Sequence, residues 1–168
     1  MKKFSVILLV LALALGLFAG CSDVLDEVVP PQTVNIDDLT MTLPGYFIDW
    51  SDEDWAEGIP FVYGFNSSAV LGIKEDVATL EATIPGLTAK DYADLFVESN
   101  ELTSTVSDED GLVTFTYTAN SESTNITYLC GVFKGSTNFW VVQCYCATED
   151  YSEFEADFIE TLKSVQMV

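Results

Sequence analysis

The sequence contains no histidine and no arginine, and its six lysines stand against 27 aspartates and glutamates. Without histidine there is no Ser-His-Asp or Cys-His pair for nucleophilic catalysis, and no zinc site of the usual histidine type. Without arginine there is no bidentate clamp for a phosphate or a carboxylate. Nucleic-acid binding depends on lysine and arginine neutralising phosphates, so this acid excess excludes that function class. We therefore expect no catalytic residues and no cofactor.

The first twenty residues have the pattern of an export signal. Lysines at positions 2 and 3 precede an apolar run from Phe4 to Phe18. This run is shorter than a membrane-spanning helix, which needs about 20 apolar residues, and small residues follow it as at a cleavage site. Phe18-Ala19-Gly20-Cys21 resembles the bacterial lipobox, usually Leu-Ala-Gly-Cys. The resemblance implies cleavage before Cys21 and a thioether-linked diacylglycerol on its sulfur. An ordinary secretory signal with an incidental cysteine is the alternative.

Cleavage there would leave a mature chain of 148 residues, enough for one domain with a hydrophobic core. Two lysines leave with residues 1–20, so four lysines remain against all 27 acids, a formal charge of −23. An anionic bilayer repels this charge, so we expect the lipid on Cys21 to supply the membrane affinity. The expected location is the extracytoplasmic side of a membrane, at the cell surface or in the periplasm.

The mature chain divides near residue 38. The segment after Cys21 is acidic and contains Pro30-Pro31, which resist regular structure. We predict that residues 21–38 form the lipidated cysteine and a flexible acidic tether. Residues 39–168 are then predicted to form one α+β domain.

The pattern of this domain predicts strands, a helix, a meander of three strands and a final helix. The strands are expected near 39–48, 61–65, 69–74, 112–118, 126–133 and 139–147. The last two are apolar at most positions, which indicates central strands buried on both faces. Thr88, with Asp91 three residues later, predicts a capped helix that ends near Asn100. An apolar stripe after Asp150 predicts the final helix. This order predicts an antiparallel sheet with helices packed on it.

This arrangement resembles the PsbP-like fold. The resemblance rests on the strand and turn at 41–46, the helix entry at 87–92, the hairpin at 133–140 and the closing amphipathic helix. An extrinsic subunit of photosystem II, a yeast Ran-binding import protein and many small bacterial lipoproteins of unassigned function share that fold. The resemblance implies an α/β/α sandwich over most of residues 39–166. The resemblance identifies no functional residue in this sequence, because proteins that share a fold can carry unrelated functional sites.

Cys130, Cys144 and Cys146 remain once Cys21 is set aside. Cys130 and Cys144 fall on two strands joined by a turn near 136–138. A register whose paired positions sum to 274 would place them opposite each other, whereas a sum of 273 would place them on opposite faces. The leading prediction is three buried thiols that act as small apolar side chains. A Cys130–Cys144 disulfide and a metal site of three thiolates are the alternatives.

Residues 49–57 combine acids with two tryptophans. The acids that offer oxygen ligands to calcium are Asp49, Asp52, Asp54 and Glu57. They lack the EF-hand spacing, so a solvated loop is the simpler interpretation. Trp50 and Trp55 are expected to be partly exposed, and they form a candidate binding patch for a peptide, a glycan or a cationic ligand.

Three functional hypotheses follow. The first is a lipid-anchored binding module without catalytic activity, whose partner is an envelope protein or a small ligand. The second is a calcium-responsive module that uses the acidic loop at 49–57. The third is a hydrolase that works through carboxylates, which predicts a deep pocket holding a carboxylate of raised pKa.

Overall fold

The computed structural model describes residues 29–121 and 124–168, so the predicted export signal, Cys21 and the first part of the predicted tether lie outside the described residues. In chain order the elements are β1 (Gln32–Ile36), β2 (Leu39–Leu43), β3 (Ile48–Asp49), η1 (Asp54–Ala56), β4 (Phe61–Phe65), β5 (Ser68–Asp76), α1 (Val77–Glu81), α2 (Ala89–Ser99), β6 (Ser107–Glu109), β7 (Leu112–Ser121), β8 (Thr124–Lys134), β9 (Asn138–Ala147), α3 (Tyr151–Lys163) and β10 (Gln166–Met167). Within these ranges no helix is long and apolar enough to cross a membrane.

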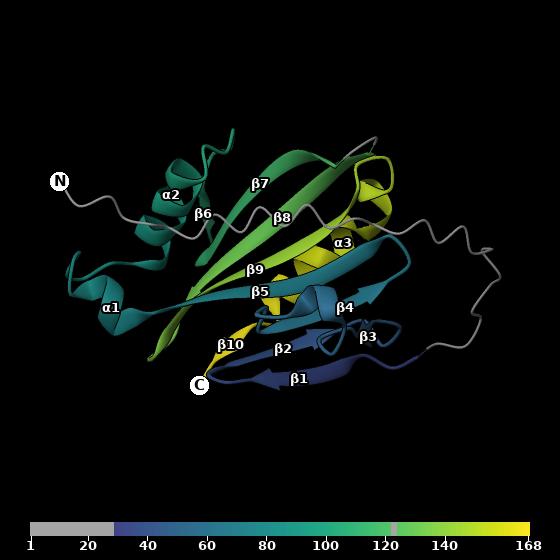
Figure 1. Cartoon of the computed structure of the whole chain (residues 1–168), viewed down its shortest axis with the longest axis horizontal. Coiled ribbons are helices and arrows are strands. Elements are labelled where there is room, and N and C mark those ends of the chain that lie inside the picture. The colour runs from purple at the N-terminus through teal and green to yellow at the C-terminus, as the bar shows by residue number, and fades with distance from the viewer. Residues whose placement is uncertain (1–28, 122–123) are drawn as a thin grey trace.

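The strands form two antiparallel sheets (Figure 1). The larger sheet has seven strands in the order β3-β4-β5-β9-β8-β7-β6, and the smaller has three in the order β1-β2-β10. β8 and β9 lie in the interior of the larger sheet, and β9 is buried at every position after Asn138. The prediction of central strands buried on both faces is therefore confirmed.

Each face of the larger sheet is covered by a different layer. α2 packs on β7 and β8 from one side. From the other side α3 packs on β8 and β9, and it also contacts β2 of the smaller sheet. This confirms the predicted α+β class, with helices on an antiparallel sheet.

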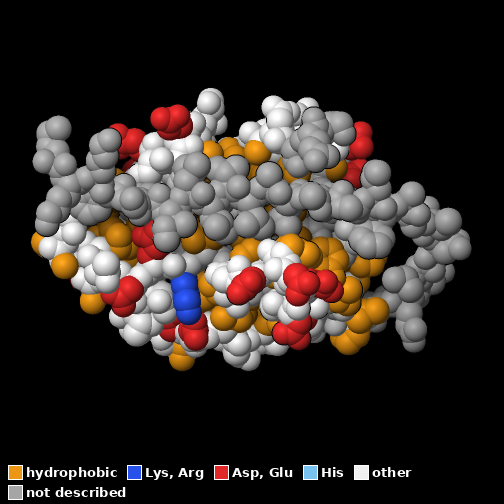
Figure 2. All heavy atoms as spheres, viewed as in Figure 1, with side chains coloured by type: hydrophobic (Ala, Val, Ile, Leu, Met, Phe, Trp, Pro, Cys, Tyr) orange, Lys and Arg blue, Asp and Glu red, His pale blue; other side chains and the backbone are white. Residues whose placement is uncertain are grey.

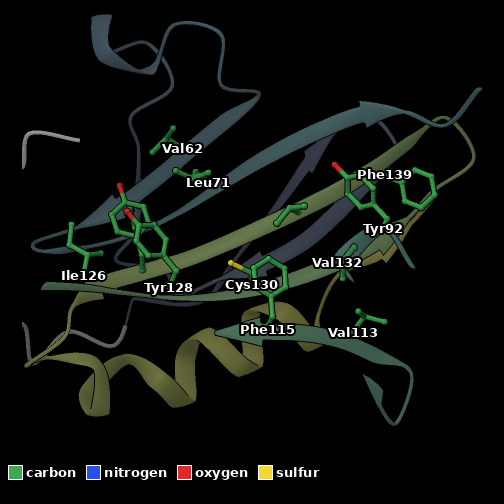
Figure 3. Close-up of a cluster of buried hydrophobic side chains, with 14 of the residues drawn as sticks. Val62, Leu71, Tyr92, Val113, Phe115, Ile126, Tyr128, Cys130, Val132 and Phe139 are labelled. Atoms are coloured by element: carbon green, nitrogen blue, oxygen red, sulfur yellow. The ribbon is translucent and has the colours of Figure 1, made fainter. Parts of the chain in front are cut away.

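Two hydrophobic clusters follow from these layers. Beneath α2, Tyr92 packs against Phe139 in a cluster that also contains Phe115 and Cys130. Figure 3 shows these side chains with Tyr128 and Val132, which project from β8 into the same cluster. The second cluster lies beneath α3 and the smaller sheet, and its members include Met41, Trp140, Phe158 and Leu162.

The capped helix is as predicted. The Thr88 hydroxyl accepts a hydrogen bond from the Asp91 N–H (3.1 Å), and the Asp91 carboxylate accepts one from the Thr88 N–H (3.1 Å). These reciprocal bonds satisfy two backbone donors at the start of α2. The helix ends at Ser99, with Asn100 as its C-cap.

The predicted boundary between tether and domain is wrong, because β1 lies inside the segment assigned to the tether. β1 pairs with β2 along its whole length, from Gln32 opposite Leu43 to Ile36 opposite Leu39. Val34 is buried in the cluster beneath α3. β1 is an edge strand with only one fully buried side chain, so its composition resembles that of a polar linker.

Asp38, in the turn between β1 and β2, joins the smaller sheet to the β8–β9 hairpin. Its carboxylate accepts hydrogen bonds from the N–H (3.2 Å) and hydroxyl (2.7 Å) of Thr137, and from the N–H (3.2 Å) and amide (3.0 Å) of Asn138. The Trp140 indole N–H donates a fifth, at 2.8 Å. Burial raises the pKa of Asp38, but hydrogen bonds from Thr137, Trp140 and Asn138 outweigh burial and hold it far below its usual value.

Candidate functional site

The loop after β3 carries both predicted surface tryptophans, and backbone contacts brace it against β4. The Trp50 N–H donates to the Val62 carbonyl (2.8 Å), and the Val62 N–H donates to the Ser51 hydroxyl (3.1 Å). The Ser51 N–H in turn donates to the Asp49 carboxylate (2.8 Å). The start of the loop is therefore held by hydrogen bonds along a short edge of the larger sheet.

Trp50 and Trp55 pack edge to face, with ring centroids 6.2 Å apart at an interplanar angle of 73°. Trp50 is half-buried and lies directly over Gly64, where an added Cβ would come within 2.0 Å of the ring. Trp55 is 39% exposed, while the next residue, Ala56, is buried and anchors the loop. The predicted partial exposure of both tryptophans is confirmed. We call Trp50, Trp55 and the acids at 49–57 the tryptophan surface.

The acids of this surface point to solvent separately. Asp49, Asp52, Asp54 and Glu57 are all exposed. Burial tends to raise the pKa of Asp49, but hydrogen bonds from Ser51 lower it overall. Across residues 29–121 and 124–168, no three acidic or cysteine side chains come together in a group suited to a metal ion. The structure therefore gives the calcium hypothesis no coordinating site in this loop.

Three lysines of the domain are already neutralised within the chain. Lys74 pairs with Asp37, Lys90 with Asp94 at 2.7 Å, and Lys134 with Glu81 at 2.6 Å. The fourth, Lys163, lies in the last turn of α3. None of the four belongs to the loop at 49–57. In the view of Figure 2, red carboxylates are spread over the surface and blue side chains are scarce.

The hairpin register separates the cysteines. Cys130 pairs with Gln143 and Leu129 with Cys144, so the paired positions sum to 273. Cys130 therefore faces the cluster beneath α2, and Cys144 and Cys146 face the cluster beneath α3. All three are buried free thiols, as the leading prediction held. The disulfide alternative is wrong, and thiols on opposite faces cannot bind one metal ion together.

Burial raises the pKa of each of these thiols. The effect is large at Cys130 and Cys144. Burial and the nearby Asp150 carboxylate raise the pKa of Cys146 to about 11. The thiolate is the reactive form of cysteine, so these side chains are inert near neutral pH.

The described surface has two shallow grooves as its best candidates for a ligand pocket. One, of 290 Å³, lies on α2 and is lined by Ile84, Leu87, Asp91, Asp94, Leu95 and Glu98. The other, of 370 Å³, is lined by Thr124, Asn125, Thr148 and Glu149. Burial raises the pKa of the Glu75 carboxyl, but Glu75 lines neither groove. The deep pocket that a hydrolase requires is not found among the described residues.

Glu75 lies instead beside Tyr92, between β5 and α2. Burial and the neighbouring carboxylate both raise the pKa of the Tyr92 phenol. Its hydroxyl has no hydrogen-bond partner of acceptable geometry within the described part of the chain. Tyr92 is buried and Glu75 half-buried, and the pair lies in the packing at the edge of α2 outside both grooves.

Comparison with known proteins identifies the fold. No family model matches the sequence, and no curated protein matches it. Among solved structures, the cyanobacterial PsbP (CyanoP) of Synechocystis is similar, with a TM-score of 0.57 and 14% identity over 88% of this chain and 98% of that one.

A crystal structure from Bacteroides thetaiotaomicron aligns with a TM-score of 0.51 and 10% identity, over 78% of this chain and 45% of that one. The Ran-binding protein Mog1p of Saccharomyces cerevisiae aligns at 0.48 and 11%, over 83% of this chain and 96% of that one. The similarity to CyanoP shows that the chain has the PsbP-like fold, as the sequence motifs predicted.

Proposed function

We propose that this protein of PsbP-like fold is a lipid-anchored, extracytoplasmic binding module without catalytic activity, and that its tryptophan surface binds a cationic segment of an envelope protein. The observation that carries the proposal is the edge-to-face pair of half-buried Trp50 and exposed Trp55 within an acidic loop that contains no lysine. Fold similarity alone would not support a function, because one fold hosts many.

The chemistry of this surface favours a cation. The face of a tryptophan ring attracts an ammonium or guanidinium group, and such a contact contributes about 0.5–1 kcal/mol at an exposed site. The surrounding carboxylates add a long-range attraction that accelerates the encounter with a basic partner. Because three lysines are paired with carboxylates elsewhere, they do not offset the acids of this loop.

The anchor is tested separately from the binding surface. Replacing Cys21 by Ser removes the thiol that would carry the lipid, and the folded domain should then move from the membrane fraction to the soluble fraction. A Cys21→Ser product that stays with the membrane would overturn the anchoring part of the proposal.

Intrinsic fluorescence gives a direct test of binding, because Trp140 is fully buried and Trp50 and Trp55 are the tryptophans near the surface. A lysine- and arginine-rich peptide should change the emission in a saturable manner, and a peptide of the same length with glutamates should not. Trp55→Ala should weaken the affinity about fivefold, the equivalent of about 1 kcal/mol. The matched control is Ile84→Ala, which truncates another exposed apolar side chain on a different surface. Equal affinity for the two peptides, or unchanged affinity of Trp55→Ala, would count against the proposal.

Crosslinking in cells tests the nature of the partner. A photoreactive residue at position 57 should capture an envelope protein with a basic exposed segment. The same crosslink should be lost when Trp55 is replaced by Ala in that chain. A captured protein without basic character, or a crosslink that persists in the Trp55→Ala chain, would contradict the assignment of the partner.

A further inference from the structure

The two ends of the sheets differ in composition. We call the end at which β1 begins the tether end; it also contains the turns between β2 and β3, between β4 and β5, and between β9 and α3. The opposite end, the far end, contains the β1–β2, β6–β7 and β8–β9 turns and α1. In Figure 1 the tether end lies on the right and the far end on the left.

Acids occur at both ends, since Asp157 accepts a hydrogen bond from the Tyr46 hydroxyl at the tether end, but the described turns carry more of them at the far end. Its acids are Asp37, Asp38, Glu75, Asp76, Glu81, Asp108, Glu109 and Asp110, against Lys74 and Lys134. At the tether end, the described turns at 44–47 and 65–68 have no charged residue. The turn after β9 has Glu149 and Asp150, and Asp150 accepts a hydrogen bond from the Ser67 hydroxyl at 3.0 Å.

The tether end also exposes apolar side chains. Ile48 is 59% exposed and Val29 is 45% exposed. Close by, Tyr46 and Phe65 are half-buried with ring centroids 4.8 Å apart. Isoleucine and tyrosine are residues that the boundary between lipid headgroups and acyl chains accommodates.

The point where the chain leaves the domain is held in place. A Cβ added at Gly45 would come within 2.1 Å of the Pro30 carbonyl oxygen, so the two backbones touch. The side chain of Gln32 donates to the Phe47 carbonyl and ties the start of β1 to the same turn. Pro30 and the turn at 44–47 therefore form one unit, from which Val29 leads back towards Cys21.

We propose that the tether end rests on the bilayer surface, with the acidic far end directed away from it. The proposal depends on the lipid anchor at Cys21 proposed above. The eight residue-to-residue steps from Cys21 to Val29 can reach at most about 28 Å. The ten residues of β9 span about 33 Å between the two ends. Since electrostatic interactions are screened over about 8 Å at physiological salt, an upright domain keeps its far-end acids clear of anionic headgroups.

The uncharged turns at 44–47 and 65–68 therefore lessen the repulsion that the formal charge of −23 suggests, and Glu149 and Asp150 are the described turn acids that remain at this end. A domain lying flat would bring carboxylates of both ends within the screening length of the headgroups. The upright orientation instead places the uncharged turns and the exposed Ile48 beside the headgroups. The apolar contact of Ile48 then adds to the membrane affinity that the lipid on Cys21 supplies.

The test compares two labels on the acylated full-length chain in vesicles that contain anionic lipid. Asn66 and Asp110 are exposed turn residues at the tether end and the far end, and both have a left-handed backbone, with φ of 52° and 54°. Asn66→Cys and Asp110→Cys therefore carry similar strain, and the buried native thiols do not compete for the fluorophore. A nitroxide on the lipid headgroups should quench the label at 66 several-fold more than the label at 110.

The outcomes separate the two proposals. A chain that does not float with the vesicles overturns the lipid anchor and this orientation together. A chain that floats but shows equal quenching, or stronger quenching at 110, overturns the orientation alone. Ile48→Glu should reduce quenching at 66 while the chain stays bound, and Ile84→Glu, on the α2 groove, should not. Unchanged quenching of the label at 66 in the Ile48→Glu chain would show that Ile48 makes no contact with the bilayer.

Discussion

Replacing Asp38 by Asn should destabilise the domain by about 3 kcal/mol, because one carboxylate organises five donors between the two sheets. A hydrogen bond to a charged acceptor contributes about 1.5–3 kcal/mol, and a buried donor left without an acceptor costs about 1–3 kcal/mol. Asparagine keeps one acceptor oxygen but turns an N–H₂ group towards donors from Thr137, Asn138 or Trp140. The five contributions are not additive and asparagine retains part of them, so the estimate lies well below their sum.

Urea unfolding of the Cys21→Ser chain, followed by the fluorescence of the buried Trp140, measures this loss. With a slope of about 1–3 kcal/mol per molar urea, the midpoint should fall by about 1–3 M. The matched control is Asp37→Asn in the same turn. Asp37 pairs with Lys74 at an exposed position and has φ of 51°, which asparagine tolerates, so its replacement should cost less than about 1 kcal/mol. Equal midpoints for the two variants would refute the role assigned to Asp38.

The pH dependence provides a second readout. The folded pKa of Asp38 is lowered, so its contribution is present above the unfolded pKa of about 3.9 and is lost as pH falls towards the folded value. The stability difference between the wild-type and Asp38→Asn chains should therefore shrink as pH is lowered below about 4. A difference that stays constant down to the lowest pH at which the chain folds would contradict the hydrogen-bonded carboxylate.

Three further predictions test other parts of the structure. Thr88→Ala should lower the free energy of unfolding by about 1 kcal/mol through loss of the α2 cap, while exposed Thr116→Ala should leave it within about 0.5 kcal/mol in the same urea assay. Gly64→Ala should displace the Trp50 ring, so its emission should shift and the basic peptide should bind more weakly; a spectrum and affinity like those of the wild type would contradict the contact. In the Cys21→Ser chain, the three sheet cysteines should resist a thiol reagent at pH 8 and react in concentrated urea; rapid reaction without urea would show that they are accessible.

The elements that could be predicted from sequence are those whose signal is local. β9 was evident because nearly every side chain is apolar, and α2 because Thr88 and Asp91 supply a capping box within four residues. The partial exposure of Trp50 and Trp55 could also be predicted, because the acids that indicate it are their neighbours in the sequence. The start of the domain was missed because β1 is a polar edge strand whose partners lie in β2.

Features that depend on distant contacts could not be read from the sequence. Both hairpin registers fit the apolar pattern of β8 and β9, and only the turn decides between them. The Gly135 N–H donates to the Asn138 carbonyl at 2.8 Å, and Asp38, about a hundred positions away, binds the same turn. The close approach of Trp50 to Gly64 likewise joins positions that no local pattern links.

The β8–β9 register also has a consequence for folding in an oxidising compartment, where the proposed export would take the chain. A slip of one position would place Cys130 opposite Cys144 in the middle of the hairpin, where a disulfide could trap the wrong pairing. The native register instead puts one layer of backbone between the two sulfurs and buries both. Folding therefore competes with oxidation. The non-native Cys130–Cys144 disulfide is avoided when β8 and β9 pair and bury both thiols before an oxidant reacts with them.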